Sequence, residues 1–383
     1  MRIDEVNVFE VTLPFTGDYS HSRRKGPSAD SVVVEVVTDQ KYVRGYGEGA
    51  PRPYVTGETQ PAAVEGVAAL TQQSCFPWQV DDISQIWEFI DAQPGGKGNN
   101  AAICAVELGL LDALGKGQQQ SVLDYFDRGF YSDTVHYGAT IPLGSAEQVA
   151  QVCQLIKAMR INQLRVKMGK LFEQNRDTLR IVEEAFGSDC DVRVDSNGAW
   201  DYQLALEHVA LIGDHGIKVV EQPLAPRDGN LGALWRAMQP LGVVLMADES
   251  VCSLEDLEQA IRDGFYGMVN VRLSKCGGLG RSLKIVERLR SEGLSFQVGC
   301  QLGESGILSA AGRALALLCC DAAYYDGSYD RFLLKENITT EDVSLGPGGE
   351  ARPLDGPGLG VKVDRERLNR LSRGSASLAI RNP

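Results

Sequence analysis

The chain has 383 residues, of which 43% are hydrophobic and 23% are charged, a composition typical of a soluble globular protein. This length is too great for one ordinary hydrophobic core and suits a barrel with a smaller second domain. The net charge of −13 argues against nucleic acid or an anionic membrane surface as a partner.

The first part of the chain, residues 1–125, is predicted to form an α+β domain. Alternating apolar residues from Ile3 to Val11 indicate a strand and not a signal peptide. Two more strands, joined by a turn, are expected over residues 31–39 and 42–49. Three helices should follow, over residues 61–73, 83–92 and 100–117. The last is predicted to be amphipathic and to end at Gly117.

From about residue 135 the pattern changes to strands alternating with helices. The expected strands are residues 135–143, 163–169, 191–197, 217–223, 244–250, 268–274, 295–301 and 322–328. The expected helices between them include residues 145–160, 202–216, 254–264, 279–293 and 307–319. This order predicts a parallel barrel over residues 126–340, with an open doubly wound sheet as the alternative. Residues 341–383 are expected to return to the N-terminal domain.

Five charged residues recur near the ends of these strands at nearly equal steps: Lys167, Asp195, Glu221, Asp248 and Lys275. Charged residues at the carboxyl ends of barrel strands are typical of active sites. Three neighbouring carboxylates suit a hard divalent cation such as Mg²⁺. The two flanking lysines suit proton transfer. The array therefore predicts a metal-dependent active site.

Residues beside this array are candidates for supporting roles. Arg165 should point to the same side of its strand as Lys167 and lower the pKa of that lysine. Asn197 is expected to orient the metal ligand Asp195. Glu249 points elsewhere and is expected to form an ion pair.

Other sequence features carry less information. The nine cysteines include no CxxC pair, which indicates free thiols and a cytoplasmic protein. No apolar run is long enough for a transmembrane helix. Gly277 and Gly278 allow a tight turn after a strand, and they are a weak signal for a phosphate-binding loop.

Several motifs together resemble the enolase superfamily. They are GYGEGAPRPYVTGET, AVELGLLDALGK, RVKMG, VDSNGAW, VEQPL, ADES and LSKCGG, and they span essentially the whole chain. Within the superfamily, the chain is similar to the mandelate racemase/muconate lactonizing enzyme family, in particular to its muconate lactonizing enzyme subgroup. The resemblance implies an α/β fold, with an N-terminal α+β capping domain on a (β/α)7β TIM-type barrel.

The resemblance also implies roles for the array. Asp195, Glu221 and Asp248 would bind Mg²⁺, with Mn²⁺ as the alternative. Lys167 and Lys275 would act on opposite faces of the α-carbon of the substrate.

Two capping loops, residues 18–25 and 51–59, would cover the pocket. Arg24 from the first loop could meet a distal carboxylate of the substrate, with a solvated charge run as the alternative. Tyr54 and Thr56 from the second loop are further candidates for substrate contacts.

The sequence departs from the family pattern at two places. Arg165-x-Lys167 replaces Lys-x-Lys, which keeps a cation and changes the shape of the pocket. Dipeptide epimerases carry Asp-x-Asp at the last strand to hold the ammonium group of the substrate, whereas this chain has Asp326 and Ser328. This change argues against a dipeptide substrate, although the stretch APRPYVTGET resembles those same epimerases.

The expected reaction is removal of a proton α to a carboxylate, through an enediolate that a metal stabilises. The leading hypothesis is a racemase or epimerase of an amino-acid derivative or dipeptide. The alternatives are a muconate-type cycloisomerase, a dehydratase like o-succinylbenzoate synthase, or a catalytically silent barrel. We expect a small carboxylate substrate, a homo-oligomer, and no nucleic-acid or membrane partner.

Overall fold

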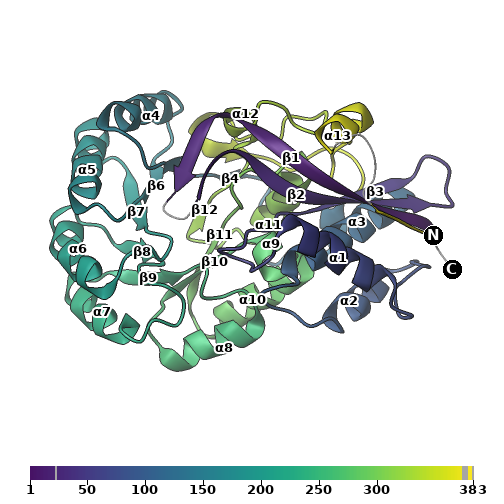
Figure 1. The fold of residues 1–383 in the computed structure, drawn as a ribbon, viewed down its shortest axis with the longest axis horizontal. Helices are drawn as coiled ribbons and strands as arrows, with labels where there is room; N and C mark the ends of the chain where they lie inside the picture. Colours follow the sequence, from purple (N-terminus) through teal and green to yellow (C-terminus); the bar gives the residue numbers. More distant parts are fainter. Residues whose placement is uncertain (22–23, 373–377, 382–383) are drawn as a thin grey trace.

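The computed structural model describes residues 1–21, 24–372 and 378–381, with the side chains of residues 18–21, 24, 25 and 378 left out. Figure 1 shows a sheet and three helices of the N-terminal part lying against one end of a parallel barrel. Within the described ranges, no helix combines the length and apolarity needed to cross a membrane.

The N-terminal domain is built on an antiparallel sheet with the strand order β14-β1-β2-β3. Its strands are β1 (Ile3–His21), β2 (Arg24–Thr38), β3 (Arg44–Gly49) and β14 (Leu378–Arg381). Strand β14 comes from the end of the chain and pairs with β1 from Glu5 to Val8. Three helices cover this sheet: α1 (Gln60–Thr71), α2 (Ile83–Asp91) and α3 (Asn100–Gln118).

Helix α3 packs against β3 almost backbone to backbone. A Cβ atom on Gly47 would lie 2.0 Å from the carbonyl oxygen of Ala105, so this contact requires glycine. The helix is buried on all sides from Asn100 to Gly115, and the prediction of an amphipathic helix is wrong. It also continues past Gly117 and ends at Gln118, and the next residue, Gln119, has a left-handed φ of 57°.

The second part of the chain forms the parallel barrel. Its strand order is β12-β11-β10-β9-β8-β7-β6-β5, so each strand pairs with its neighbours in sequence. The strands are β5 (Ala139–Ile141), β6 (Gln163–Lys167), β7 (Asp191–Asp195), β8 (Val219–Glu221), β9 (Val244–Ala247), β10 (Met268–Val271), β11 (Ser295–Val298) and β12 (Tyr324–Tyr325). A hydrogen bond of 2.8 Å from the N–H of Gly138 to the carbonyl of Tyr325 joins the two edges. The α/β barrel fold predicted from the sequence is confirmed.

The strand expected over residues 135–143 is divided in two. Its first part, β4 (Val135–His136), pairs with β13 (Glu350–Ala351) outside the barrel. The helices between and after the strands are α4 (Ala146–Ala158), α5 (Phe172–Phe186), α6 (Tyr202–Asp214), α7 (Leu231–Met238), α8 (Leu254–Asp263), α9 (Leu273–Cys276), α10 (Leu279–Ser291), α11 (Gly306–Leu318), α12 (Asp330–Leu333) and α13 (Arg365–Leu371).

A buried carboxylate links the two domains at the start of α10. Glu107 from α3 accepts hydrogen bonds from the N–H groups of Leu279 and Gly280, the latter at 2.9 Å. Gly278 has a φ of 109°, and a Cβ atom there would lie 1.9 Å from Glu107 Oε2. The two glycines had suggested a phosphate-binding site at this helix N-terminus. The carboxylate of Glu107 occupies that position instead.

We predict that Glu107→Ala lowers the free energy of unfolding by about 2–4 kcal/mol, because it leaves two buried N–H groups without an acceptor. Urea unfolding of both proteins measures this difference. The control is Glu287→Ala on the exposed face of α10, which should change stability by less than about 0.5 kcal/mol. Equal effects of the two substitutions would contradict the role of Glu107.

Candidate active site

The array of five charged residues lies at the carboxyl ends of adjacent barrel strands. Lys167, Asp195 and Glu221 are the last residues of β6, β7 and β8. Asp248 directly follows β9. Lys275 differs from the expectation, because β10 ends at Val271 and the lysine lies in the short helix α9.

Lys167 is held by groups from the next strand. Its Nζ donates hydrogen bonds to Asp195 Oδ2 and, at 3.0 Å, to Asn197 Oδ1. Asn197 also donates from its backbone N–H to Asp195 Oδ1 at 2.8 Å and from its side chain to Glu249 at 3.2 Å. Asn197 therefore contacts both the lysine and a candidate metal ligand.

Glu249 is fully buried and forms no ion pair within 4 Å among the described residues, so the predicted ion pair is absent there. Burial, together with the charges of Asp248 and Asp195, raises the pKa of Glu249 to about 7. One of its carboxylate oxygens, Oε2, has no hydrogen-bond partner.

Lys275 is fully buried on the other side of the array. Its Nζ donates to the carbonyl of Asp248 at 2.7 Å and to Asp248 Oδ1 at 3.1 Å. Burial lowers the pKa of Lys275, but the charge of Asp248 together with the neighbouring Cys276 and Cys252 outweighs it, so its pKa lies above the usual value. The ammonium form is therefore favoured in this arrangement.

Arg272 is a central residue that the sequence analysis missed. Its guanidinium group pairs with Asp248 and lies 3.4 Å from Glu221 Oε1. Asn270 donates to the same Glu221 oxygen at 2.6 Å. Alternation along residues 270–272 could have placed both side chains on the same side as the predicted ligands.

The three candidate metal ligands are all fully buried, and their oxygens are largely engaged by Lys167, Arg272 and Lys275. Within the part of the chain that the structure describes, no three His, Cys, Asp or Glu side chains are arranged to hold a metal ion. The donor chemistry nevertheless fits Mg²⁺, because three carboxylates end adjacent strands and Glu221 Oε2 is buried without a hydrogen bond.

Asp326 lies in a buried ion-pair cluster. It accepts hydrogen bonds from Arg193 at 2.6 Å and Gln297 at 2.9 Å, and its Oδ2 lies 3.0 Å from Arg165. The positive charges of the two arginines hold the pKa of Asp326 below its usual value against the effect of burial, which is to raise it. Arg193, which stands two residues before Asp195, was not singled out from the sequence.

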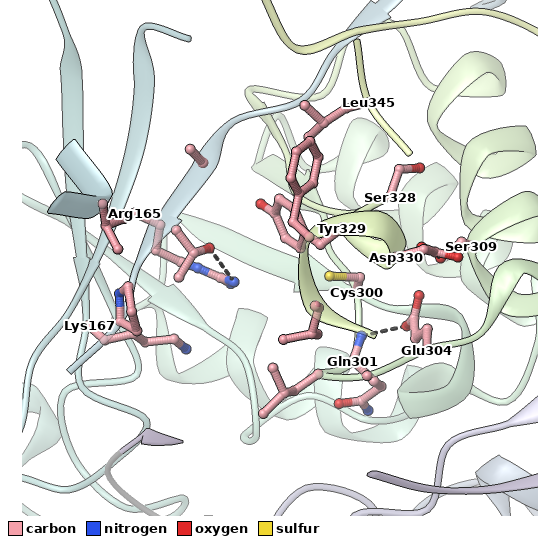
Figure 2. Close-up of a pocket in the computed structure, with 18 of the residues that line it drawn as sticks. Arg165, Lys167, Cys300, Gln301, Glu304, Ser309, Ser328, Tyr329, Asp330 and Leu345 are labelled. Carbon is pink, nitrogen blue, oxygen red and sulfur yellow. Dashed lines mark hydrogen bonds between the residues drawn. The ribbon is translucent and has the colours of Figure 1, made fainter. Parts of the chain in front are cut away.

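A cavity of about 340 Å³ opens beside these groups. Its wall includes Arg165, Lys167, Arg272, Tyr54 and Ser328. Figure 2 shows Arg165 and Lys167 on one side of the cavity, opposite Tyr329, Cys300 and Glu304.

Lys275 and Thr56 are not part of this wall. Lys275 is buried behind it, and Thr56 accepts hydrogen bonds from the N–H groups of Arg52 and Glu58 within its own loop. Ser328 accepts a hydrogen bond from Arg313 at 3.0 Å. The side chain of Arg24 is outside the described part of the structure.

Glu304 is an acidic residue of the cavity wall that was not predicted. It follows β11 and accepts a hydrogen bond from the N–H of Gln301. Burial raises the pKa of Glu304 to about 8, and the nearby Glu48 and Asp330 add to this effect. The side chain is therefore mostly protonated at neutral pH.

A model of the family described as "Enolase C-terminal domain-like" matches residues 147–367. The chain belongs to the enolase superfamily. Its membership of the mandelate racemase/muconate lactonizing enzyme family, which the sequence motifs suggested, is confirmed.

Two known proteins align with most of this chain. A hydrophobic dipeptide epimerase from Enterococcus faecalis is 28% identical over 369 residues, which are 94% of this chain and 99% of the relative. Chloromuconate cycloisomerase CbnB from Cupriavidus necator is 28% identical over 280 residues, which are 73% and 74% of the two chains. A solved dipeptide epimerase from E. faecalis, in complex with Mg and the dipeptide L-Leu-L-Tyr, matches with a TM-score of 0.82 and 26% identity. The match covers 94% of this chain and 100% of the chain in that structure.

We predict that Asp326→Asn destabilises the protein by about 3 kcal/mol, because Arg165 and Arg193 lose their buried counter-charge. Chemical unfolding followed by circular dichroism measures the change. Asp321→Asn is the control, since Asp321 pairs with Arg290 near the surface and should contribute less than about 1 kcal/mol. A stable Asp326→Asn protein would leave Asp326 available for a direct role in substrate binding.

Proposed function

We propose that this protein is an isomerase that removes and returns a proton α to a substrate carboxylate, and that it acts as a racemase or epimerase of an amino-acid derivative. The observation that carries the proposal is the position of two lysines on either side of three buried carboxylates. The relatives named as an epimerase and a cycloisomerase support an isomerase.

The residues divide the chemistry between them. Asp195, Glu221 and Asp248 would hold Mg²⁺, which would stabilise negative charge on the carboxylate oxygens of the substrate. The solved relative in complex with Mg supports this choice of ion. Lys167, which lines the cavity, takes the proton from one face of the α-carbon.

Lys275 returns the proton on the opposite face. Asn197 orients Lys167, and Arg272 offsets the charge of Asp248 and Glu221. Buried charges with fixed hydrogen-bond partners need little rearrangement during the reaction.

Cycloisomerisation is the second candidate, because the two lysines differ in access. Lys167 lines the cavity, whereas Lys275 is fully buried and donates to two oxygens of Asp248. A cycloisomerase or dehydratase needs only one lysine as an acid or base. The two mechanisms are separated by substitution of each lysine.

We predict that Lys167→Ala and Lys275→Ala each abolish racemisation. Each variant should still exchange the α-proton of one enantiomer with solvent, and this enantiomer should differ between the two variants. The reason is that each variant keeps the base on one face of the α-carbon. Proton NMR in D₂O, with Mg²⁺ and a panel of acylamino acids, dipeptides and muconates, measures the exchange.

Lys170→Ala is the control, since this exposed lysine lies three residues after Lys167 and should leave the rates unchanged. Exchange of the same enantiomer in both lysine variants would favour the one-base alternative. Absence of turnover of every substrate by the parent enzyme would contradict the proposed function.

We also predict that Asp195→Asn weakens Mg²⁺ binding at least tenfold, because a neutral group replaces one of three anionic ligands. Isothermal titration calorimetry measures the affinity. Asp214→Asn on the exposed end of α6 should bind Mg²⁺ as the parent does. Unchanged affinity in Asp195→Asn would remove this residue from the metal site.

A further inference from the structure

The short helix α9, which carries Lys275, is held by groups of the N-terminal domain. Ser274, the fully buried residue before the lysine, accepts a hydrogen bond from the N–H of Ala50 at 2.8 Å. The side chain of Asn100, at the start of α3, donates to the carbonyl of Lys275 at 2.6 Å. The position of Lys275 in the barrel therefore depends on residues outside the barrel.

Asn100 also contacts a second segment of the barrel. Its amide nitrogen donates to the carbonyl of Cys252 at 2.7 Å. Cys252 lies four residues after Asp248, in the segment that follows β9, whereas Lys275 lies in the segment that follows β10. One side chain thus joins the segments that carry Asp248 and Lys275. The two residues also meet directly, because Lys275 Nζ donates to Asp248 Oδ1 at 3.1 Å.

The contacts of the Asn100 amide fix its orientation. The oxygen accepts a hydrogen bond from the N–H of Gly96 at 3.0 Å, while the nitrogen faces two carbonyl oxygens. A rotation of the amide by 180° would turn its oxygen toward both carbonyls and lose all three bonds. The side chain is fully buried, so water cannot replace these bonds. Asn100 therefore holds the two barrel segments in one arrangement.

The start of α3 is itself held by the capping loop of residues 51–59. Glu58 from this loop accepts a hydrogen bond from the N–H of Ala101 at 2.9 Å. Tyr54, from the same loop, lines the cavity beside the array. The loop that meets the cavity and the amide that holds α9 therefore belong to one hydrogen-bonded unit.

We propose that Asn100 is a positioning residue for Lys275, through which the N-terminal domain sets the geometry of proton transfer on one face of the substrate. Lys167 is held independently, because its partners Asp195 and Asn197 belong to β7 and the segment that follows it. Loss of the Asn100 amide should therefore affect one face only. This proposal rests on the proposed function, which gives each lysine one face of the α-carbon.

The test measures α-proton exchange by Asn100→Ala in D₂O with Mg²⁺, with both enantiomers of N-acetylleucine and both epimers of alanyl-L-leucine as probes. The form whose exchange is lost in Lys275→Ala should exchange roughly 10- to 100-fold more slowly, because a small displacement of a reacting group has an effect of this size. The form that depends on Lys167 should change by less than about twofold, since its base keeps its partners.

Asn99→Ala is the matched control. Asn99 is the exposed residue before Asn100, and its side chain makes no capping hydrogen bond to α3. This variant should exchange both forms as the parent does. Asn100→Ser is the second variant, since a hydroxyl keeps one donor of shorter reach. It should slow the Lys275-dependent form by less than Asn100→Ala does, and it keeps the test available if Asn100→Ala does not fold.

A second measurement does not require turnover. Hydrogen exchange of the Mg²⁺-loaded proteins, followed by mass spectrometry, compares a peptide of residues 272–278 with one of residues 164–170. In Asn100→Ala the first peptide should exchange faster than in the parent, because the contact that holds α9 is lost. The second peptide, which carries Lys167, should be unchanged.

Equal slowing of both forms, or equal changes in both peptides, would make Asn100 a general structural residue and overturn the inference. Parent-like exchange of both forms by Asn100→Ala would overturn it as well. Either result leaves the proposed function standing. If the parent turns over neither these probes nor the wider panel, the proposed function fails. The two peptides then still decide whether Asn100 holds the segment that carries Lys275.

Discussion

At the carboxyl ends of the barrel strands, several cations and several carboxylates are buried together, and the site depends on their pairing. Lys167 pairs with Asp195, and both Arg272 and Lys275 pair with Asp248. Removing one partner of such a pair costs far more than the pair contributes, because it leaves a buried charge without compensation. The same residues that could perform chemistry are therefore also constraints on folding.

This pairing explains why the two halves of the candidate site differ. The groups around Asp195 and Asp248 lie near the cavity, whereas Asp326 is enclosed by Arg165, Arg193 and Gln297. Two buried arginines pair with Asp326, which makes it a structural charge in this arrangement. The chemistry of the pocket therefore depends on which carboxylates are already paired with cations, and not only on which residues lie at strand ends.

Much of this architecture could be predicted from sequence, because strand and helix spacing is local information. The barrel, and the placement of Lys167, Asp195 and Glu221 at strand ends, followed from the regular repeat. The role of Arg272 and the ion pair between Arg193 and Asp326 depend on contacts between strands that are distant in sequence. The burial of α3 on all sides was missed because its second neighbour, the barrel, lies far along the chain.

The contact between β3 and α3 has a consequence for how this protein can tolerate mutation. A Cβ atom on Gly45, Gly47 or Gly49 would lie 2.0–2.2 Å from a carbonyl oxygen of α3. Most core positions respond gradually to a change in volume, since neighbouring side chains can adjust. Here the neighbour is main chain, so even one methyl group forces the two elements apart. The tolerance of this strand to substitution at its glycines is therefore close to all-or-none.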